Sequence, residues 1–411
     1  MSNTAYHPKI INDPVHGFIS IRTPLAYNLI SLPMFQRLRN IKQLGLTYLV
    51  YPAACHSRFQ HALGTMHVMN KSVEGLRQKG VEITEDEAEA AECAALLHDV
   101  GHGPFSHVLE FSLLQNVHHE DISRATIEYI NRSKFIDQLS LTLQIFDGTY
   151  PKKFLHQLIS SQIDVDRMDY LRRDSYFSGV TEGAIGVERL IRMFNVHNNE
   201  LVIEAKGVHS VEQFLLARRL MYWQVYLHKT VVAAEQLLVN IFKRARYLLQ
   251  QSNCKLLIRD NLQYFLENNI TQQKLQQSEV LSRFWELTDA DIESAIKDFR
   301  NCEDAVLRDL CDMFLTRRLP HMEILETPFT AVQIEQQKHS FAQRANNANL
   351  LPDYFVGSDV LSNKPYSLTN NGIKMLTPQG QVVDLCDLSQ VLNTTAFLQD
   401  DKKYFLYSPK F

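Results

Sequence analysis

Hydrophobic residues recur at three- and four-residue spacing over most of the first 250 positions, a period typical of amphipathic helices. Gly, Pro or Asn residues interrupt the pattern and divide it into separate segments. Helices are therefore predicted over residues 24–45, 57–79, 84–99, 119–131, 135–146, 152–173, 185–194 and 208–250. Two further helices are predicted at 279–299 and 302–318, followed by a connector at 319–330.

Other parts of the chain depart from the helical period. Residues 9–21, KIINDPVHGFISI, alternate apolar and polar positions around a proline and a glycine, which predicts a short hairpin. The run NELVIEAKG at 199–207 predicts a strand at a surface turn. In the tail, turn signals at 370–372 and 378–380 lie between short strand-like runs, which predicts a small region of mixed structure.

The predicted fold is mainly α, with a helical core, a short N-terminal β-hairpin and a small α+β C-terminal region. A chain of 411 residues with 45% hydrophobic content can bury a substantial core in one large or two ordinary domains. We divide it into an N-terminal hairpin and helix at 1–50, which belong to the core, the catalytic core at 51–250, a helical extension at 251–330, and the C-terminal region at 331–411.

Composition narrows the classes of function. The 15 glycines and 13 prolines fall below their usual combined share of about 12%, which favours long elements. A net charge of −4 argues against strong nucleic-acid binding. No apolar run is long enough for a membrane span and no signal peptide is recognisable, so we expect a cytoplasmic protein. The six cysteines form no CxxC pair, which suits reduced thiols. Basic residues cluster locally at three places, for which solvated helix faces are the simplest interpretation: Arg37, Arg39, Lys42 and Arg58; Arg167, Arg172 and Arg173; Arg218, Arg219 and Lys229.

The segment CAALLHDVGHGPFSH, residues 93–107, places His98 and Asp99 at the end of an apolar helix, where both are costly to desolvate. Adjacent helix positions point about 100° apart, so these side chains converge on one point only near the helix end. A metal ion is such a point, because imidazole and carboxylate together suit a divalent ion of intermediate hardness.

Two ligands are too few, and other segments supply candidates. RFQH adds His61, while IDVDRMDYLRRD adds Asp164, Asp166, Asp169 and Asp174. Helical spacing puts Asp166, Tyr170 and Asp174 on one face. Taken singly, such a histidine is more often a core or surface residue, and an aspartate is more often solvated. The joint pattern is what indicates a metal site.

The motifs RFQHALG, HDVGHGPFSH, HHED and IDVDRMDYLRRD resemble, in order and spacing, the HD-domain phosphohydrolases. Within them the chain is most similar to the dNTP triphosphohydrolases related to the SAM-and-HD-domain enzyme. The resemblance runs from NDPVHG through FQRLRNIKQLG to RRLMYWQVYLHK, about the first 240 residues, and weakly to LTDADI and TRRLPH. It implies an HD-domain core holding one divalent metal ion per site (Mn, Fe, Zn, Ni, Co or Mg), with the ligands His61, His98, Asp99 and Asp166.

The reaction implied by the resemblance releases a deoxynucleoside and triphosphate from a dNTP. Its metal would polarise a phosphoryl oxygen, and the departing sugar oxygen needs a proton donor. The resemblance assigns this donor to His119, oriented by Glu120, while His118 stays an alternative. His102, included among the catalytic residues, and His107 match phosphate-facing histidines of the family; orienting a ligand or capping a helix is the alternative for both.

A nucleotide pocket is implied as well. Arg58, three residues before His61 on one helix face, would contact a phosphate during catalysis, with a surface arginine as the alternative. Arg218, Tyr222, Tyr226 and Lys229 form a stripe on one predicted helix face; in isolation such a stripe is more often core packing. The resemblance implies phosphate or pocket-edge contacts for Arg218 and Lys229 and a phosphate contact for Arg167. It implies that the Tyr226 ring stacks on the sugar and rejects a 2′-hydroxyl, and that Tyr170 and Asp174 lie near the sugar. It implies nucleobase contacts for Gln43 and Leu44.

The same resemblance predicts self-association and a regulatory nucleotide. It implies a homo-oligomer, dimer or tetramer, and a nucleotide activator at a region matched by Lys9, Asn12, Gln36 and Arg39. Ser31 replaces the acidic residue of relatives that are activated by guanine nucleotides, which leaves base selectivity open. Two other functions stay open: an HD-type nucleotide monophosphatase or phosphodiesterase, and a non-catalytic nucleotide-sensing protein. No GxxxxGK[ST] motif occurs, so a P-loop NTPase is not expected.

Overall fold

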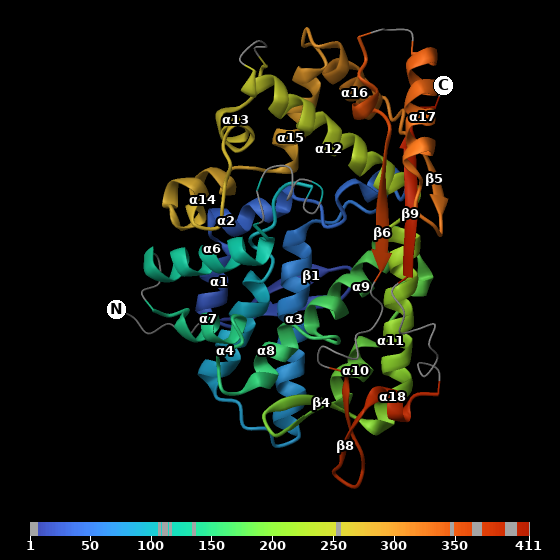
Figure 1. Ribbon diagram of the computed structural model, residues 1–411. Helices are drawn as coiled ribbons and strands as arrows, with labels where there is room; N and C mark the ends of the chain where they lie inside the picture. Colours follow the sequence, from blue (N-terminus) through green and yellow to red (C-terminus); the bar gives the residue numbers. More distant parts are fainter. Residues whose placement is uncertain are drawn as a thin grey trace.

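The computed structural model describes residues 7–105, 108, 114, 117–133, 137–251, 256–345, 349–363, 372–390 and 401–410 (Figure 1). The fold is mainly α, as predicted, with small sheets toward the C-terminus. The predicted hairpin is confirmed: β1 (Lys9–Asp13) pairs with β2 (Gly17–Ile21) in antiparallel register. None of the described helices has the length and hydropathy needed to span a bilayer.

The core is built around α3 (Arg58–Gln78), which packs against α4 (Glu85–Leu97) and α9 (Val165–Ser178). Further helices surround these three: α1 (Pro24–Ile30), α2 (Pro33–Gln36), α6 (His119–Ser133), α7 (Ser140–Phe146), α8 (Lys153–Ile159) and α10 (Val187–Met193). The long predicted helix at 24–45 is wrong, because Pro33 starts a new helix at its N-terminus and a 3₁₀ turn follows at Arg37–Asn40.

Two other predicted helices are also divided. Residues 152–173 form α8 and α9, because the Asp164 side chain accepts a hydrogen bond from the Arg167 backbone N–H and so begins a new helix. Residues 208–250 form α11 (Val208–Met221), a π-helical turn (Tyr222–Tyr226) and α12 (Lys229–Gln250), whose cap is His228. Sequence periodicity misses these breaks because the apolar spacing continues across them.

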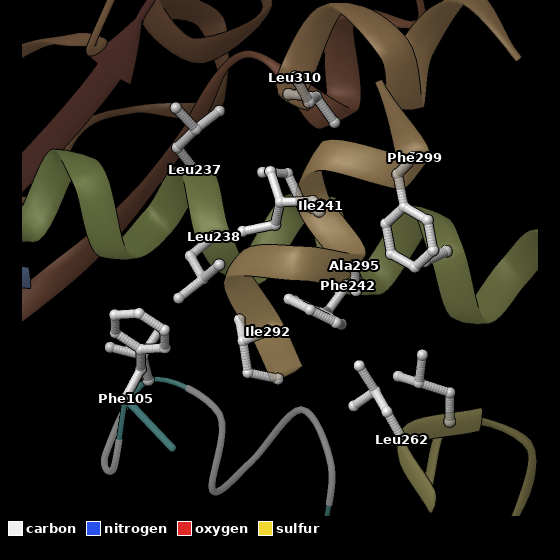
Figure 2. Packing of buried hydrophobic residues seen from close by; sticks show 14 of the residues in the cluster. Phe105, Leu237, Leu238, Ile241, Phe242, Leu262, Ile292, Ala295, Phe299 and Leu310 are labelled. Carbon is white, nitrogen blue, oxygen red and sulfur yellow. The ribbon is translucent and has the colours of Figure 1, made fainter. Parts of the chain in front are cut away.

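The helical extension packs around α12 (Figure 2). It consists of α13 (Asp260–Glu267), which was not predicted, α14 (Ser278–Trp285), α15 (Asp289–Phe299) and α16 (Ala305–Leu315). Leu238 of α12 and Ile292 of α15 lie in one buried cluster with Phe105, which belongs to the loop after the His98–Asp99 pair. Full burial of a side chain of this size contributes about 1.5–3 kcal/mol. The extension therefore anchors one end of that loop.

Two sheets connect the C-terminal region to the rest. The order β3 (Phe194–His197), β4 (Glu200–Glu204), β7 (Lys374–Leu376), β8 (Val382–Asp384) places tail strands beside the predicted strand at 199–207, and the predicted turn at 378–380 joins β7 to β8. In the second sheet, β9 (Asp401–Ser408) lies between β5 (His321–Leu325) and β6 (Gly357–Asn363). The predicted connector at 319–330 thus contains a strand. Among its described residues, Ala331–Arg344 form helix α17 and Leu385–Leu388 form helix α18.

Candidate active site

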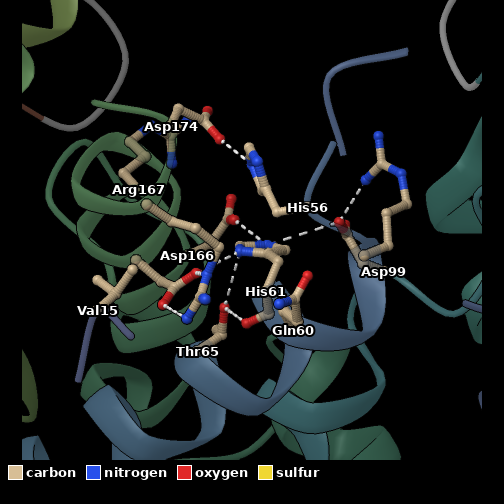
Figure 3. Close-up of polar contacts among 12 residues, drawn as sticks. Val15, His56, Gln60, His61, Thr65, Asp99, Asp166, Arg167 and Asp174 are labelled. Carbon is tan, nitrogen blue, oxygen red and sulfur yellow. Dashed lines mark hydrogen bonds and ion pairs between the residues drawn. The ribbon is translucent and has the colours of Figure 1, made fainter. Parts of the chain in front are cut away.

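Three helix ends bring the predicted metal ligands together. His61 lies in the first turn of α3, which Ser57 and Gln60 begin with a capping box. His98 and Asp99 follow the last turn of α4, and Asp166 lies in the first turn of α9. Figure 3 shows His61 between Asp99 and Asp166, with dashed contacts to both. Residues 105 positions apart in the chain therefore meet at one point because α3, α4 and α9 pack side by side.

The facing atoms are close, and His61, His98 and Asp99 are buried while Asp166 is partly exposed. His61 Nε2 lies 3.3 Å from His98 Nε2 and 3.1 Å from Asp166 Oδ1, and His98 Nε2 lies 3.4 Å from the same oxygen. Asp99 completes the group, with Oδ1 3.3 Å from His98 Nε2 and Oδ2 3.6 Å from His61 Nε2. The structure thus brings all four predicted ligands into one cluster.

Hydrogen bonds on the far side of each imidazole show that this cluster fits a metal ion. His98 Nδ1 lies 2.8 Å from the carbonyl oxygen of Ala95, and His61 Nδ1 lies 2.8 Å from Asp169 Oδ2. Both partners only accept, so both Nδ1 atoms carry the hydrogen. Once a metal ion has displaced the proton from Nε2, the Nε2 lone pairs face each other and the carboxylates, an arrangement suited to a divalent cation.

Electrostatics in the cluster favour positive charge. Burial lowers the pKa of His61, but hydrogen bonds with Asp166 and Asp169 outweigh it and raise that pKa to about 10. Burial raises the pKa of Asp166, yet hydrogen bonds from His61 and His98 hold it below its usual range. The carboxylates are thus ionised at neutral pH, and their field attracts a cation to the space between the imidazoles.

A second group of side chains meets the first at Asp99. Arg58 donates to Asp99 Oδ2 at 2.6 Å, and His102 Nε2 lies 3.3 Å from Asp99 Oδ1. The His102 ring stacks on that of His119, with centroids 3.8 Å apart and an interplanar angle of 17°. Burial and the nearby Arg58 hold the pKa of His102 well below its usual value, so this ring is neutral. The contacts of His102 with Asp99 and His119 are those of a residue that orients a metal ligand, which is the alternative to the predicted phosphate contact.

His119 begins α6, which lies directly against the loop after Asp99. A Cβ on Gly101 would fall 2.2 Å from the His119 carbonyl oxygen and 2.3 Å from the Ser123 backbone nitrogen, so only glycine allows this approach. His119 Nε2 lies 3.3 Å from Glu120 Oε1, whose side chain is 65% exposed. The His118 side chain is exposed, whereas the His119 ring stacks on that of His102, so His119 and not His118 belongs to this second group of side chains. His107 lies outside the described residues.

Most of the predicted sugar contacts lie along α9 and the π-helical turn. Asp174 receives a hydrogen bond from Tyr226 Oη at 2.8 Å and lies 2.7 Å from His56 Nε2. The Tyr170 ring is 6.4 Å from that of His61 and 6.1 Å from that of Tyr226. These groups therefore connect the metal ligands to a cluster of aromatic and carboxyl groups.

The residues predicted to contact the nucleobase and a phosphate lie in different surroundings. The Gln43 backbone N–H donates to the His56 carbonyl at 2.9 Å, and Gln43 Oε1 is buried with no hydrogen-bond partner among the described residues. Leu44 packs at the border of the core. Arg167 pairs with the buried Asp164 and donates to the Ser161 carbonyl, so its guanidinium is turned onto the start of α9.

The predicted stripe of four residues on one helix face is wrong at its end. The Arg218 guanidinium lies 5.8 Å from the Tyr222 ring centroid, and the Tyr222 and Tyr226 rings are 5.2 Å apart. Lys229, in contrast, starts α12 after a change of direction and is exposed. The break at Leu227 and His228, between the π-helical turn and α12, therefore separates Lys229 from the other three residues.

Several residues that shape the site were given no role by the sequence. Arg37 is buried and donates to the carbonyls of Leu287, Val100 and His102, and burial together with Arg58 lowers its pKa to about 9. Asp289, the first residue of α15, accepts from the backbone of Lys42 and Phe105. Arg37 had been interpreted as part of a solvated face. The sequence signal for their burial is that these charged residues lie inside apolar stretches, Arg37 in FQRLR and Asp289 in LTDADI.

Comparisons with known proteins agree with this geometry. The HD domain model matches residues 58–174, and the model of the HD associated region matches 185–286. The chain is 34% identical to an uncharacterized protein of Bacillus subtilis, YwfO, over 98% of this chain and 92% of that protein. It is 32% identical to the deoxynucleoside triphosphate triphosphohydrolase SAMHD1 homolog of Dictyostelium discoideum, over 60% of this chain and about half (51%) of that protein. A solved phosphohydrolase of Bacteroides thetaiotaomicron is 42% identical, with a TM-score of 0.93 over 98% of this chain and 100% of that one. Together with the His/Asp cluster, these matches place the chain in the family of HD-domain metal-dependent phosphohydrolases.

Proposed function

We propose that this protein is a dNTP triphosphohydrolase, which releases a deoxynucleoside and triphosphate. The observation that carries the proposal is that Asp99 lies between two groups of side chains. It contacts His61 and His98 on one side and Arg58 and His102 on the other, and His119 lies within 4.8 Å of it. A metal centre and a histidine proton donor therefore flank one position, as hydrolysis of a phosphate ester requires.

The chain's own residues then have separate tasks. A divalent ion held by His61, His98, Asp99 and Asp166 would supply Lewis-acid chemistry toward a phosphoryl oxygen. Arg58 stabilises negative charge that develops on the α-phosphate. Water forms the new bond to the α-phosphorus, the bond from phosphorus to the sugar 5′-oxygen breaks, and His119 delivers the proton to that oxygen. His102 keeps the His119 ring in place by stacking on it.

The choice of a deoxynucleotide rests on the other end of the site. Tyr226 is held by its hydrogen bond to Asp174, and Asp174 is held in turn by His56. A ring fixed in this way beside Tyr170 excludes a bulkier sugar, because moving it breaks buried hydrogen bonds. The SAMHD1 homolog of Dictyostelium discoideum, named as a deoxynucleoside triphosphate triphosphohydrolase, supports the same substrate class.

Product analysis tests this proposal directly. Purified protein is incubated with Mn²⁺ and each dNTP in turn, and the products are separated by anion-exchange chromatography. Tripolyphosphate and deoxynucleoside in equal amounts are expected. Release of only orthophosphate or pyrophosphate would instead support an HD-type monophosphatase or phosphodiesterase, and no turnover with any nucleotide would support a nucleotide-sensing protein.

Tyr226→Ala is expected to weaken discrimination between dNTP and NTP by about 10- to 100-fold, since it removes the ring that excludes the 2′-hydroxyl. The measurement is the ratio of kcat/KM for dATP to that for ATP. Tyr226→Phe separates the two contributions, because it keeps the ring and loses only the hydrogen bond to Asp174; its ratio is expected to lie between those of wild type and the alanine variant. An unchanged ratio in the alanine variant would contradict the assigned role of this ring.

A further inference from the structure

Behind the metal ligands lies a buried network that reaches the N-terminal hairpin. Asp169, one turn after Asp166 on α9, is fully buried, and each of its oxygens has two hydrogen-bonding partners. His61 Nδ1 and Arg173 Nε lie 2.8 and 2.9 Å from Oδ2, while His16 Nε2 and Arg173 Nη2 lie 2.6 and 2.9 Å from Oδ1. No acceptor capacity of this carboxylate is left for a substrate.

The network continues into the turn between β1 and β2. Arg173 Nη1 donates to Asp13 Oδ2 at 2.7 Å, and Asp13 Oδ1 accepts from the backbone N–H groups of Val15 and His16 at 2.9 Å each. These bonds fix the turn in the orientation that points His16 at Asp169. Val15, in the middle of the turn, is visible at the edge of the site in Figure 3.

The packing of α3 on α9 is shaped to admit this network. A Cβ on Gly64, one turn after His61, would fall 1.8 Å from Asp169 Oδ1 and 2.4 Å from Arg173 Nη2. Any larger residue at this position would displace the carboxylate from the three side chains that it contacts. The absence of a side chain at residue 64 is therefore a requirement of the contacts around Asp169.

We propose that Asp169, Arg173 and His16 are positioning residues for His61, and that the turn of the N-terminal hairpin is thereby part of the metal centre. Asp169 obliges His61 to carry its hydrogen on Nδ1, which directs the Nε2 lone pair toward His98 and Asp166. Arg173 and His16 hold the carboxylate in the plane that this bond requires. The proposal rests on the metal centre and not on the choice of substrate.

The direct change, Asp169→Asn, leaves the buried Arg173 short of a charge partner and destabilises the fold. The test therefore uses His16, which lies outside the ligand cluster. His16→Ala removes one donor to Asp169, whereas His16→Gln places an amide N–H close to the same point. His67→Ala is the matched control, because the His67 ring lies 5.2 Å from that of His16 and makes no described contact with Asp169.

Co²⁺ binding to the metal-free protein is followed by visible absorption, and thermal unfolding is measured with and without the metal. His16→Ala is expected to raise the Kd for Co²⁺ by about 10- to 100-fold, the usual cost of losing a group that orients a ligand. His16→Gln should recover most of this loss, and His67→Ala should bind as wild type does.

Two results would overturn the proposal. One is wild-type Co²⁺ affinity in His16→Ala, including the case in which only the metal-free protein becomes less stable. The other is an equal loss of affinity in His16→Ala and His67→Ala, which would indicate general packing. These readouts use no nucleotide, so failure of the dNTP proposal leaves them unaffected. A wild-type protein that binds no Co²⁺ would overturn both the metal centre and this proposal.

Discussion

Asp166→Ala is expected to abolish metal retention and to lower kcat by at least about 10³-fold, the scale of several kcal/mol of lost transition-state stabilisation. Asp166 Oδ1 lies within 3.4 Å of both facing Nε2 atoms, so the substitution removes a carboxylate oxygen that is close to both imidazoles at once. Metal content after gel filtration, measured by mass spectrometry, and kcat with Mn²⁺ check this result.

Asp86→Ala is the matched control for this change. Asp86 is the second residue of α4, as Asp166 is the second residue of α9, but its side chain is exposed and far along the helix from His98. Both substitutions remove a carboxylate from a first helical turn, with a similar small cost of about 0.3–1 kcal/mol in helix-dipole energy. Retention of a full equivalent of metal by the Asp166→Ala protein would contradict the proposed ligand set.

His119→Ala is expected to lower kcat by about 10² to 10⁴, the range for loss of a positioned general acid. Metal content should stay close to the wild-type value, because His119 is not one of the four proposed ligands, although it lies within 4.8 Å of one of them, Asp99. The KM for dNTP should also change little, because the proposed task of His119 is proton transfer and not substrate binding. The substitution therefore separates proton transfer from metal and substrate binding.

His118→Ala is the control that the sequence itself offers. The two histidines are adjacent, but the His118 side chain is exposed and that of His119 stacks on His102. Its kcat should stay within about twofold of wild type, since surface substitutions of this kind rarely change a site. A larger fall in His118→Ala than in His119→Ala would reverse the assignment of the proton donor.

The local sequence pattern predicts a helix correctly where the capping residues and the apolar period lie in one continuous segment. The helices at 57–79, 84–99 and 119–131 are confirmed within a few residues, because their caps and apolar periods agree. Prediction failed where the same apolar spacing runs across a break, as between α8 and α9 and between α11 and α12. At these breaks a single side chain, Asp164 or His228, begins a new helix by accepting from a backbone N–H.

The sequence pattern does not show which charged side chains are buried. Arg37, Arg173 and Arg167 belong to segments that read as solvated faces, yet the first two are buried and Arg167 is turned onto Asp164. Their partners are distant in sequence: Arg173 meets Asp13 at a separation of 160 residues, and Arg37 meets Leu287 at 250. A buried charge is stable only with such partners, so its environment cannot be inferred from its neighbours along the chain.

By itself, the sequence determined the helical class and the hairpin, because helical period and turn residues are properties of short segments. It also supplied candidate metal ligands, among which the resemblance to HD-domain phosphohydrolases selects His61, His98, Asp99 and Asp166. Only the tertiary structure decided which nitrogen of His61 faces His98 and Asp166, which of two histidines stacks on His102, and that the hairpin turn lies behind His61. These features depend on distances between groups on different elements. Such distances are set by how α3, α4 and α9 pack, which no local pattern specifies.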